Sequence, residues 1–438
     1  MSQWLDSLTL WLTASPKWLG LAIFLIAFLE CLAIAGILVP GTVLLFAVAV
    51  LAGHGALTLS ETLALAYCGG LLGDLLSYAT GRYFHQDIRR LPGLRHHPQW
   101  MAGAELYVQR YGIASLLVGR FIGPLRPMLP MIAGMLSMPF GRFVLVSLLA
   151  SAGWALAYLL PGWATGAALR LPLPAGFWPE AAVLAAGLAA LLLLSAHDSL
   201  RERRRASWIA AGLSLLLLFG LLIGWPRLDQ FDRGLLALIQ EQRSASLDTL
   251  MVLITRLGDF SSQLAAGLLL CLLLLLTRQW RALSFAGGTL LATALANGAL
   301  KALLARHRPQ VLLEPLHSFS LPSGHSSAAF AFFLVLGVLA GRGQPARLRL
   351  AWLLLASLPA MTVALSRVYL GVHWPSDIIA GALLAGGLCA LSLGLTQWRM
   401  PQPGLAAKVW WLILPACLAL LGAIATRHLS QGLLLYRY

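Results

Sequence analysis

The fold follows from residues 366–397, SRVYLGVHWPSDIIAGALLAGGLCALSLGLTQ. Within this stretch, residues 377–397 carry a single charged side chain, Asp377, and about 20 apolar helical residues are enough to cross the ~30 Å hydrocarbon core of a bilayer. We therefore predict a membrane helix here, starting near Pro375, since proline is favoured in the first turn of a helix. Similar apolar runs recur along the second half of the chain, at residues 207–225, 262–276, 283–304, 323–340, 350–366 and 409–426.

The composition extends this interpretation to the whole chain. Of the 438 residues, 59% are hydrophobic and 11% are charged, and the mean hydropathy is +0.81, whereas soluble globular chains carry about 25% charged residues. We predict an all-α, polytopic integral membrane protein. Asp6 and Lys17 interrupt the first apolar residues, so we expect no cleavable signal peptide and direct insertion of the mature helices.

The basic charge fits membrane topology better than a nucleic-acid partner. The formal net charge is +15, but Lys and Arg gather in short loops between apolar runs, as the positive-inside rule describes. We therefore expect no nucleic-acid partner, since that would require a basic stripe on a water-exposed domain. The five cysteines lack metal-ligand or disulfide spacing and are expected to be small core residues; they are Cys31, Cys68, Cys271, Cys389 and Cys417.

A basic segment, HDSLRERRR at residues 197–205, divides the sequence between two apolar helices and predicts a cytoplasmic linker. The expected organisation is a first membrane domain over residues 1–196, the linker over 197–206 and a second membrane domain over 207–438. Counting helices from the linker places the other motif-free basic loops on the same side; they contain Arg278, Arg281, Arg342, Arg347, Arg349, Arg399 and Lys408. Loops 226–261, 305–322 and 367–376 then face the opposite side, which we expect to be the periplasm of a bacterial inner membrane.

Three segments on that opposite side carry residues suited to binding phosphate. Lys301 and Arg308 are nearly two helical turns apart and share a face at a helix end. Residues 322–325, PSGH, open the next apolar helix, where free N–H groups and the helix dipole attract anions. The third segment is residues 366–377. Each segment alone has an ordinary interpretation as snorkelling cations or helix caps, but their joint occurrence indicates phosphate chemistry.

These segments, KALLARHRP (301–309), PSGH (322–325) and SRVYLGVHWPSD (366–377), closely resemble the signature of the type 2 phosphatidic acid phosphatase superfamily, the lipid phosphate phosphatases. The stretch LDTLMVLITRLGD (247–259) is similar to that family's helix entry, and the resemblance covers roughly residues 207–426. It implies a six-helix bundle and a metal-independent phosphatase that works through a phosphohistidine.

The resemblance also implies a role for each matched residue. His373 is the expected nucleophile, Asp377 orients its imidazole, and His325 is the general acid and later the base. A clamp of cations and helix-start groups would bind the phosphate in place of a metal; it consists of Lys301, Arg308, Ser323, Gly324 and Arg367. We expect no metal and no other cofactor. Arg306 and His307 lie between matched positions and receive no catalytic role.

Residues from about 15 to 170 resemble the DedA family, also described by its VTT domain, through FLECLAIAGILVPGT, GDLLSYATGR and GRFIGPLRPMLPMIAGM. Two Gly/Pro-interrupted segments, AIAGILVPGT and FIGPLRPMLPMIAG, predict broken, re-entrant segments that line a cavity, as at transporter sites. Many DedA proteins have an acid where this chain has Thr42, so proton coupling through paired acids is not implied. Ionisable groups at such depth are usually functional, and a role in lipid head-group transport is expected for Glu30, Asp74, Arg120 and Arg126.

The leading hypothesis is an enzyme that converts undecaprenyl pyrophosphate to undecaprenyl phosphate at the periplasmic face, coupled to a DedA-like domain that moves the lipid phosphate. Phosphatidylglycerol phosphate and phosphatidate are alternative substrates. A different class is a lipid transporter or scramblase whose phosphatase-like domain only binds head groups, but such a site needs no nucleophile, carboxylate and general acid together. Vanadium haloperoxidases share a similar pocket, although membrane helices beside each motif favour a lipid substrate. The sequence leaves the oligomeric state open.

Overall fold

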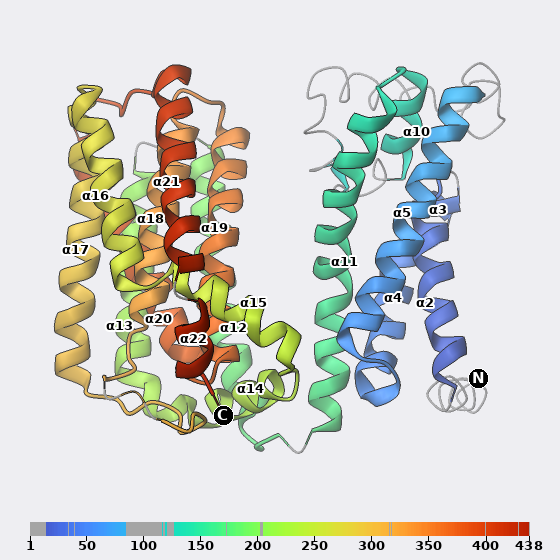
Figure 1. Ribbon diagram of the computed structural model, residues 1–438, viewed down its shortest axis with the longest axis horizontal. Coiled ribbons are helices and arrows are strands. Elements are labelled where there is room, and N and C mark those ends of the chain that lie inside the picture. Colours follow the sequence, from blue (N-terminus) through green and yellow to red (C-terminus); the bar gives the residue numbers. More distant parts are fainter. Residues whose placement is uncertain are drawn as a thin grey trace. The chain divides into compact units, whose positions relative to one another are not determined.

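The computed structural model describes residues 15–33, 35–38, 40–84, 116, 119–120, 127–171, 173–201, 205–314, 316, 318–398, 400–427 and 429–437. These residues form helices and no strand, and they divide into two compact units, Met1–Pro172 and Leu173–Tyr438 (Figure 1). Within the described ranges, nine helices are long and apolar enough to cross a membrane, or up to ten if the bent pair formed by α15 and α16 is one span. The prediction of an all-α, multi-pass membrane protein is confirmed.

The N-terminal unit is built around two long helices, α5 (Leu59–Tyr83) and α11 (Phe140–Arg170). A capping box starts α5: Thr58 Oγ1 accepts a hydrogen bond from the Glu61 amide, and the Glu61 carboxylate accepts one from the Thr58 amide. The short helix α10 (Met128–Met135) packs closely against α5, because a Cβ at Gly81 would lie 1.9 Å from the Met131 carbonyl oxygen. Glycine at this position therefore sets the approach of the two backbones.

The first Gly/Pro-rich segment interrupts the helices as expected. α2 (Pro16–Cys31) is followed by the four-residue helix α3 (Ala35–Leu38), then by α4 (Gly41–Leu51) and the π-helical turn η1 (Ala52–Ala56). Pro40 precedes α4 and has no amide hydrogen to donate, which fits the break. In the second segment, residues 121–126 lie outside the described residues, and α10 is too short to cross a bilayer. That both segments are re-entrant stays a prediction.

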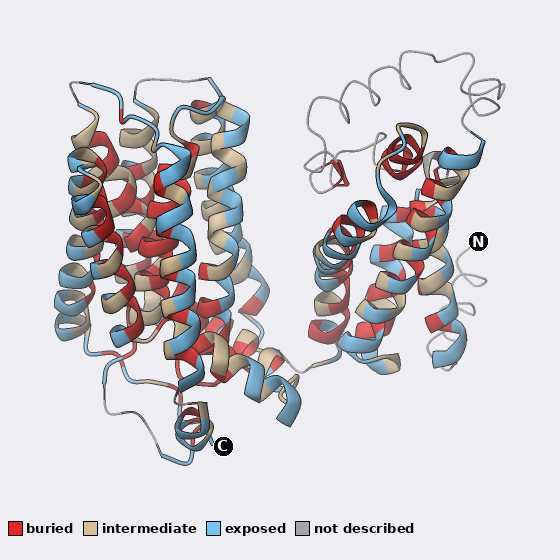
Figure 2. Ribbon diagram, turned by 45° about the horizontal axis from the view of Figure 1, so that its top comes forward, coloured by how far each residue is buried: buried red, intermediate tan, exposed pale blue. Residues whose placement is uncertain are grey.

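The C-terminal unit contains, among its described residues, eight helices of 17 residues or more: α12 (Phe177–Leu200), α13 (Ala206–Gly224), α16 (Phe260–Leu276), α17 (Trp280–Leu304), α18 (Gly324–Gly341), α19 (Ala346–Tyr369), α20 (Pro375–Thr396) and α21 (Ala407–Arg427). α18 packs against α17, α19 and α20, and buried residues gather in the interior of the unit (Figure 2). Its core includes Phe285, Phe332 and Val363. The six-helix bundle expected within residues 207–438 stays a prediction.

Helix α12 belongs to the C-terminal unit. It packs against α13 and α14, and the Phe231 amide donates a 2.7 Å hydrogen bond to Glu180 Oε2. The compact units thus divide between Pro172 and Leu173, before α12, whereas the division predicted from the basic segment lies after α12, at residue 196. The basic segment marks a loop between helices, and loop charge carries no information about which unit a helix packs against. Residues 202–204 of the expected linker lie outside the described residues.

Short helices gather at one end of the C-terminal unit (Figure 1). They are η3 (Trp225–Leu228), α14 (Asp229–Gln240), α15 (Ala245–Leu257) and α22 (Leu429–Leu435). Hydrogen bonds join the basic loops at the other end: Arg349 Nη2 donates to the Ser199 carbonyl at 3.4 Å, and Arg281 Nη2 donates to the Thr396 carbonyl at 3.0 Å. Arg342 Nη1 also donates to Gln397 Oε1 at 3.1 Å, so the end of α12 and these basic loops lie on one side of the unit, as the counting of helices required.

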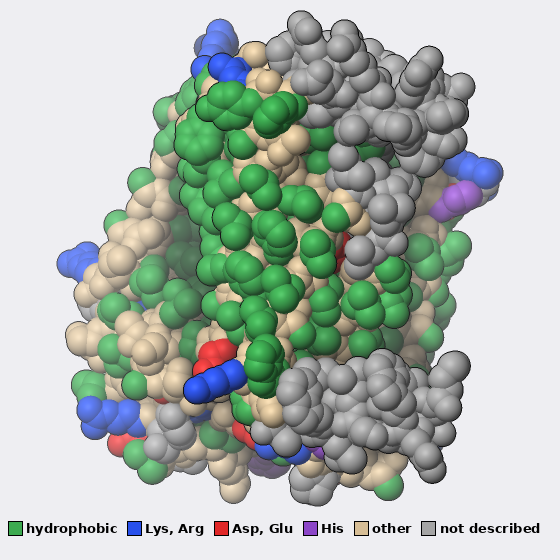
Figure 3. Space-filling view, turned by 90° about the vertical axis from the view of Figure 1, so that its right-hand side faces the viewer, with side chains coloured by type: hydrophobic (Ala, Val, Ile, Leu, Met, Phe, Trp, Pro, Cys, Tyr) green, Lys and Arg blue, Asp and Glu red, His purple; other side chains and the backbone are tan. Residues whose placement is uncertain are grey.

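The surface of the molecule suits a lipid environment. Where Figure 3 colours the side chains by type, hydrophobic ones cover most of the face and charged ones are few. In the N-terminal unit, the exposed large hydrophobic residues include Leu21, Leu25, Leu72, Leu76, Leu145, Leu149 and Leu156. Contiguous apolar surface on this scale is rare in water-soluble monomers and is expected on helices that face hydrocarbon.

Candidate active site

The expected catalytic residues lie at the end of the C-terminal unit that carries the short helices. Lys301 is in the last turn of α17, and Ala305, the residue that follows this helix, has a left-handed conformation with φ 46°. The following loop carries Arg308 and leads to Ser323 at the start of α18. His373 lies in the short turn between α19 and α20. Helix ends therefore bring three separate segments of the sequence to one place.

His373 is held through both nitrogens of its imidazole. The ring is 1% exposed, its Nδ1 lies 3.2 Å from Asp377 Oδ2, and its Nε2 lies 2.9 Å from Arg308 Nη1. Asp377 follows one helical turn later, in the first turn of α20, and its Oδ2 also accepts a 2.9 Å hydrogen bond from the Trp374 amide. Because a guanidinium can only donate, Nε2 must accept from Arg308, and the imidazole proton then sits on Nδ1, facing Asp377.

The surroundings favour a neutral His373. Burial lowers the pKa of His373 well below its ordinary value, and the positive charges of Arg308 and Arg367 lower it further. Burial, together with repulsion from Arg367, lowers the pKa of Arg308 to about 10, so this residue remains a cation at neutral pH. A neutral imidazole with its proton on Nδ1 has a lone pair on Nε2, which is the form that a nucleophilic histidine requires.

Lys301 and Arg308 converge on the same short stretch of the loop. Lys301 Nζ donates to the Phe319 carbonyl at 2.6 Å, and Arg308 Nε donates to the Ser318 carbonyl at 2.7 Å. A Cβ at Gly324 would lie 3.8 Å from Lys301 Cε, which places the start of α18 beside the lysine. Two cations and a helix start thus meet next to His373, as expected for a phosphate clamp.

Ser323 caps α18 and ties it to α20. Its Oγ accepts hydrogen bonds from the Ser326 amide at 3.4 Å and from Ser326 Oγ at 3.0 Å, and its own amide donates to the Asp377 carbonyl at 3.0 Å. The first amides of a helix have no partner within that helix. Ser323 therefore fixes the positive end of α18 next to the turn that carries His373.

Arg367 is buried in the last turn of α19, with 1% of its surface exposed. Its Nη1 donates to Thr255 Oγ1 at 2.9 Å and to Tyr436 Oη at 2.8 Å. Its Nε has no hydrogen-bond acceptor in the described part of the chain, and buried donors normally have a partner. A phosphate oxygen would supply one. The Arg367 carbonyl also accepts a 3.3 Å hydrogen bond from the His373 amide, which couples the clamp to the expected nucleophile.

His325 has an acidic partner to which the sequence analysis assigned no role. His325 Nε2 lies 2.9 Å from Asp259 Oδ1, and Asp259 stands between α15 and α16. Gly258 makes this approach possible, because a Cβ there would lie 2.4 Å from Val363 Cγ1 and 3.2 Å from His325 Cβ. One feature of the sequence could have indicated this partner. Gly258 and Asp259 lie in a loop that the counting of helices places on the same side as the three motifs.

Arg306 is the second residue that the sequence analysis left without a role. It is 6% exposed and contacts two buried carboxylates, those of Asp232 and Asp377. Asp232 lies on α14, well before the phosphatase motifs in the sequence. A lone Asp in an amphipathic stretch and an Arg between two motif positions give no sign, by themselves, that they meet.

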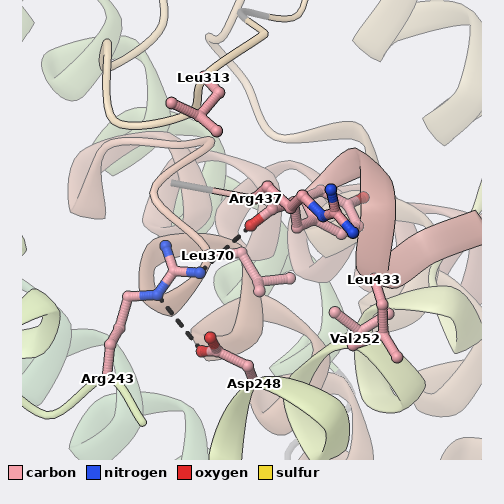
Figure 4. Close-up of a pocket in the computed structure, with 8 residues that line it drawn as sticks. Arg243, Asp248, Val252, Leu313, Leu370, Leu433 and Arg437 are labelled. Carbon is pink, nitrogen blue, oxygen red and sulfur yellow. Dashed lines mark hydrogen bonds and ion pairs between the residues drawn. The ribbon is translucent and has the colours of Figure 1, made fainter. Parts of the chain in front are cut away.

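A pocket of about 210 Å³ lies next to the segment that carries Arg243 and Asp248 (Figure 4). Its lining consists of Arg243, Asp248, Val252, Leu313, Leu370, Leu433, Tyr436 and Arg437. Arg243 Nε lies 3.3 Å from Asp248 Oδ1, and Arg243 Nη2 donates to the Tyr436 carbonyl at 3.3 Å. Because the Tyr436 hydroxyl binds Arg367, the pocket shares a wall residue with the candidate active site.

In the N-terminal unit, Arg120 forms a buried ion pair with Asp74, and its Nη2 donates to Cys31 Sγ at 3.2 Å. The cavity beside this pair measures about 10 Å³, which is close to the space that a single water requires. Glu30 Oε1 accepts a 3.1 Å hydrogen bond from Thr42 Oγ1. Arg126, the fourth residue expected at this site, lies outside the described residues.

Two segments of the chain, one in each half, match known protein families. Residues 39–164 match the family model of the VTT domain, and residues 281–401 match that of the PAP2 superfamily. The chain is 35% identical over 161 residues to the inner membrane protein YabI of Escherichia coli K12, covering 37% of this chain and 63% of YabI. It is 31% identical over 157 residues to the inner membrane protein YqjA of the same strain, covering 35% of this chain and 71% of YqjA. The chain thus spans about two thirds of the length of these relatives.

The chain is also similar to a solved structure, that of the transmembrane PAP2-type phosphatidylglycerolphosphate phosphatase from Bacillus subtilis. The two are 26% identical, with a TM-score of 0.40, and the match covers 43% of this chain and 96% of that chain. The protein is a polytopic membrane protein made of two membrane domains. It belongs to the VTT-domain (DedA) family through its N-terminal part, and residues 281–401 form a domain that matches the PAP2 superfamily.

Proposed function

We propose that the C-terminal unit hydrolyses the phosphate or diphosphate of a membrane lipid through a phosphohistidine at His373, without a metal ion. The observation that carries this proposal is the placement of His373, with Nδ1 3.2 Å from Asp377 Oδ2 and Nε2 2.9 Å from Arg308 Nη1. This arrangement supplies a neutral imidazole whose lone pair faces the cations that would hold the substrate.

The first step breaks the bond between phosphorus and the leaving oxygen. The clamp of Lys301, Arg308 and Arg367 binds the phosphate oxygens, displacing the guanidinium of Arg308 from Nε2 onto the substrate. His373 Nε2 attacks phosphorus, and the electron pair of the breaking P–O bond leaves with the lipid oxygen. Protonated His325, held by Asp259, gives its proton to that oxygen. The positive charge that develops on the imidazole of His373 is balanced by Asp377.

The second step returns the enzyme to its starting state. A water oxygen attacks the phosphorus of the phosphohistidine while His325, now neutral, takes a proton from that water. The N–P bond breaks, its electron pair returns to His373 Nε2, and inorganic phosphate leaves. The cations stabilise the charge on the equatorial oxygens in both steps.

We favour undecaprenyl pyrophosphate as the substrate and its monophosphate as the product. An apolar surface around the unit suits a long isoprenoid tail, and three cations suit a diphosphate, whose charge is higher than that of a monophosphate. Phosphatidylglycerol phosphate and phosphatidate are the competing substrates. Initial rates of phosphate release from these three lipids in detergent would rank them.

The active site is proposed to face the periplasm, because the basic loops lie at the opposite end of the unit. Single cysteines at Glu314, in the loop between α17 and α18, and at Arg347, in the first turn of α19, test this in a background without native cysteines. Both positions are exposed. A membrane-impermeant maleimide added to intact cells that have a permeabilised outer membrane should label position 314 and spare position 347. Labelling of 347 alone would reverse the orientation.

The decisive experiment on the reaction is trapping with ³²P-labelled lipid phosphate and an excess of chelator, with the reaction stopped in alkaline detergent. The wild-type protein should release phosphate and form a base-stable, acid-labile phosphoenzyme, as expected of a phosphorus–nitrogen bond. His373→Gln should do neither, while the matched variant His307→Gln, an exposed histidine in the adjacent loop, should behave as wild type. Loss of wild-type activity in chelator, or turnover by His373→Gln, would contradict the mechanism. Lipid binding without phosphate release would favour the head-group-binding transporter.

A further inference from the structure

A buried arginine connects the expected catalytic carboxylate to a second acid. Arg306 Nη1 donates to Asp377 Oδ1 at 2.8 Å, and Arg306 Nη2 donates to Asp232 Oδ2 at 2.6 Å. Aromatic rings lie against the guanidinium: its carbon is 4.5 Å from the centre of the Trp225 ring and 5.5 Å from that of Trp374. Arg306 is therefore fixed by two charged partners and two aromatic side chains.

Asp232 joins this arrangement to the start of α20. Its side chain is fully buried, its Oδ1 accepts a 2.8 Å hydrogen bond from the Ser376 amide, and its Oδ2 accepts one of 2.5 Å from Ser376 Oγ. The Ser376 hydroxyl oxygen also lies 2.8 Å from Arg306 Nη1. Asp232 thus anchors Arg306 and, at the same time, holds the first turn of the helix that carries Asp377.

The two oxygens of Asp377 have separate partners. Oδ2 lies against His373 Nδ1 and the Trp374 amide, whereas Oδ1 binds Arg306. A carboxylate held from both sides cannot rotate away from the imidazole. The cluster of Asp232, Arg306 and Asp377 carries a net charge of one negative unit when both acids are ionised, so a positive charge that develops on His373 makes the group of four residues neutral.

We propose that Arg306 is a positioning residue, with Asp232 as its counter-ion, that keeps Asp377 ionised and oriented so that His373 presents Nε2 to phosphorus. This inference rests on the proposed function, because it takes His373 as the nucleophile. Asp232 lies outside residues 281–401, which match the PAP2 superfamily. The N-terminal part of the unit thus contributes a side chain to the organisation of the site.

The charged groups around Asp377 determine how the loss of Arg306 would change the protonation of Asp377. Facing Asp377 are Arg306 from the loop after α17, His373 from the turn before α20 and Asp232 from α14, while Lys301 and Arg308 act on it from a greater distance. Without Arg306, two buried acids lose their shared cation, and one of them binds a proton more readily. A protonated Asp377 no longer balances a cationic His373, so phosphohistidine formation should require a higher pH.

The test is the single-turnover rate of phosphohistidine formation from ³²P-labelled lipid phosphate across the pH range, measured with the full-length protein. Arg306→Gln should slow this step on the order of 100-fold at neutral pH, with little change in KM, because a small misplacement of a catalytic group can cost that much. The lower limb of its pH profile should move to higher pH. Arg306→Lys keeps the positive charge but lacks the planar set of donors of a guanidinium. Its rate of phosphohistidine formation should fall less than that of Arg306→Gln, and its pH profile should stay closer to that of the wild type.

Two further variants separate positioning from folding. The double variant Arg306→Gln, Asp232→Asn restores the net charge of the buried cluster, so it should recover thermal stability relative to Arg306→Gln while phosphohistidine formation stays slow. Arg233→Gln is the matched control, since Arg233 is an exposed arginine on α14, paired with Asp229; it should match wild type in rate and pH profile.

The outcomes distinguish this inference from the proposed function. If the wild-type protein forms no phosphohistidine, the proposed function fails, whatever the variants do. The positioning role of Arg306 is wrong if the wild-type protein forms phosphohistidine and a folded variant forms it at the same rate and with the same pH profile. This holds for Arg306→Gln and for the double variant. A slow double variant that melts at the wild-type temperature supports the role.

Discussion

The hydroxyl of Tyr436 lies 2.8 Å from Nη1 of Arg367 and so shares the buried guanidinium with Thr255. Tyr436 follows α22, which packs against α15, and its carbonyl accepts a hydrogen bond from Arg243. The segment after α21 thus closes over an arginine of the phosphate clamp. It lies beyond residues 281–401, so the part of the chain that matches the PAP2 superfamily is not the whole of the candidate site.

Tyr436→Phe should weaken substrate binding more than it slows turnover. The change removes one hydrogen bond to a charged group, worth about 1.5–3 kcal/mol, and allows Arg367 to leave its position. We expect KM for the lipid phosphate to rise about 10-fold, with a smaller effect on kcat, in initial-rate measurements. Tyr83→Phe, at an exposed tyrosine of the N-terminal unit, is the control. An unchanged KM would mean that Thr255 alone holds Arg367.

Gly258→Ala should impair the general acid selectively. A Cβ at this position would lie 2.4 Å from Val363 Cγ1 and 3.2 Å from His325 Cβ, so the pairing of His325 with Asp259 must shift. Protonation of the leaving oxygen matters most for poor leaving groups. We therefore expect a loss on the order of 100-fold for a lipid monoester, and a much smaller loss for p-nitrophenyl phosphate, whose leaving group needs no proton.

Gly288→Ala provides the comparison for this variant, because a Cβ there would meet no atom within 4 Å. Both substrates should be turned over by Gly288→Ala at wild-type rates. Equal losses for the two substrates in a folded Gly258→Ala protein would show that the variant disturbs the site as a whole and would remove the support for His325 as the acid.

The pH dependence of phosphohistidine formation should report the neutral form of His373. Burial and the cations Arg308 and Arg367 lower the pKa of His373 well below about 6.5, so the reactive neutral form persists below that pH. Activity that depends on this form is lost only as the pH falls through the lowered pKa. Arg308→Gln removes one of the causes, so the pKa of His373 should rise and the acid limb should move to higher pH. If the acid limb of Arg308→Gln stays at the wild-type pH, the charge of Arg308 does not control the protonation of His373 in the reaction.

Much of the fold could be predicted from the sequence because the bilayer allows few solutions. Apolar runs of about 20 residues must be helices, and loop charge sets their alternation. The motif residues were also predictable, since Lys301, His325 and His373 stand at helix ends in a fixed order. The sequence did not predict that α12 belongs to the C-terminal unit. The unit to which a helix belongs depends on the helices that it packs against and not on the pattern of its own residues.

The residues that support the motifs were harder to find. Asp232, Asp259 and Tyr436 are far in sequence from the residues that they contact, and each has an ordinary local interpretation as a helical or loop residue. Buried charges must be paired, so the need for partners was foreseeable. Their identity depends on how α14, α15 and α22 fold against the bundle, which periodicity does not determine.

The N-terminal unit is proposed to carry the dephosphorylated lipid head group across the membrane, and the Arg120–Asp74 pair provides the test. Among the described residues, Asp74 is bound to Arg120, and the cavity beside the pair measures about 10 Å³, which is smaller than a phosphate. Transport on this proposal requires the pair to separate so that Arg120 can bind the head group. Loss of Arg120 alone would remove the cation paired with the buried carboxylate of Asp74 and destabilise the protein by about 3–5 kcal/mol.

The informative variant is therefore the double replacement Arg120→Gln, Asp74→Asn, which removes both charges and preserves the size of the side chains. It should fold, keep the phosphatase activity of the C-terminal unit in detergent, and lose transfer of fluorescent polyprenyl phosphate between the leaflets of reconstituted vesicles. Arg142→Gln, at an exposed arginine of α11, should leave all three properties unchanged. If the folded double variant moves the lipid at the wild-type rate, the Arg120–Asp74 pair only holds helices together and the carrier proposal is wrong.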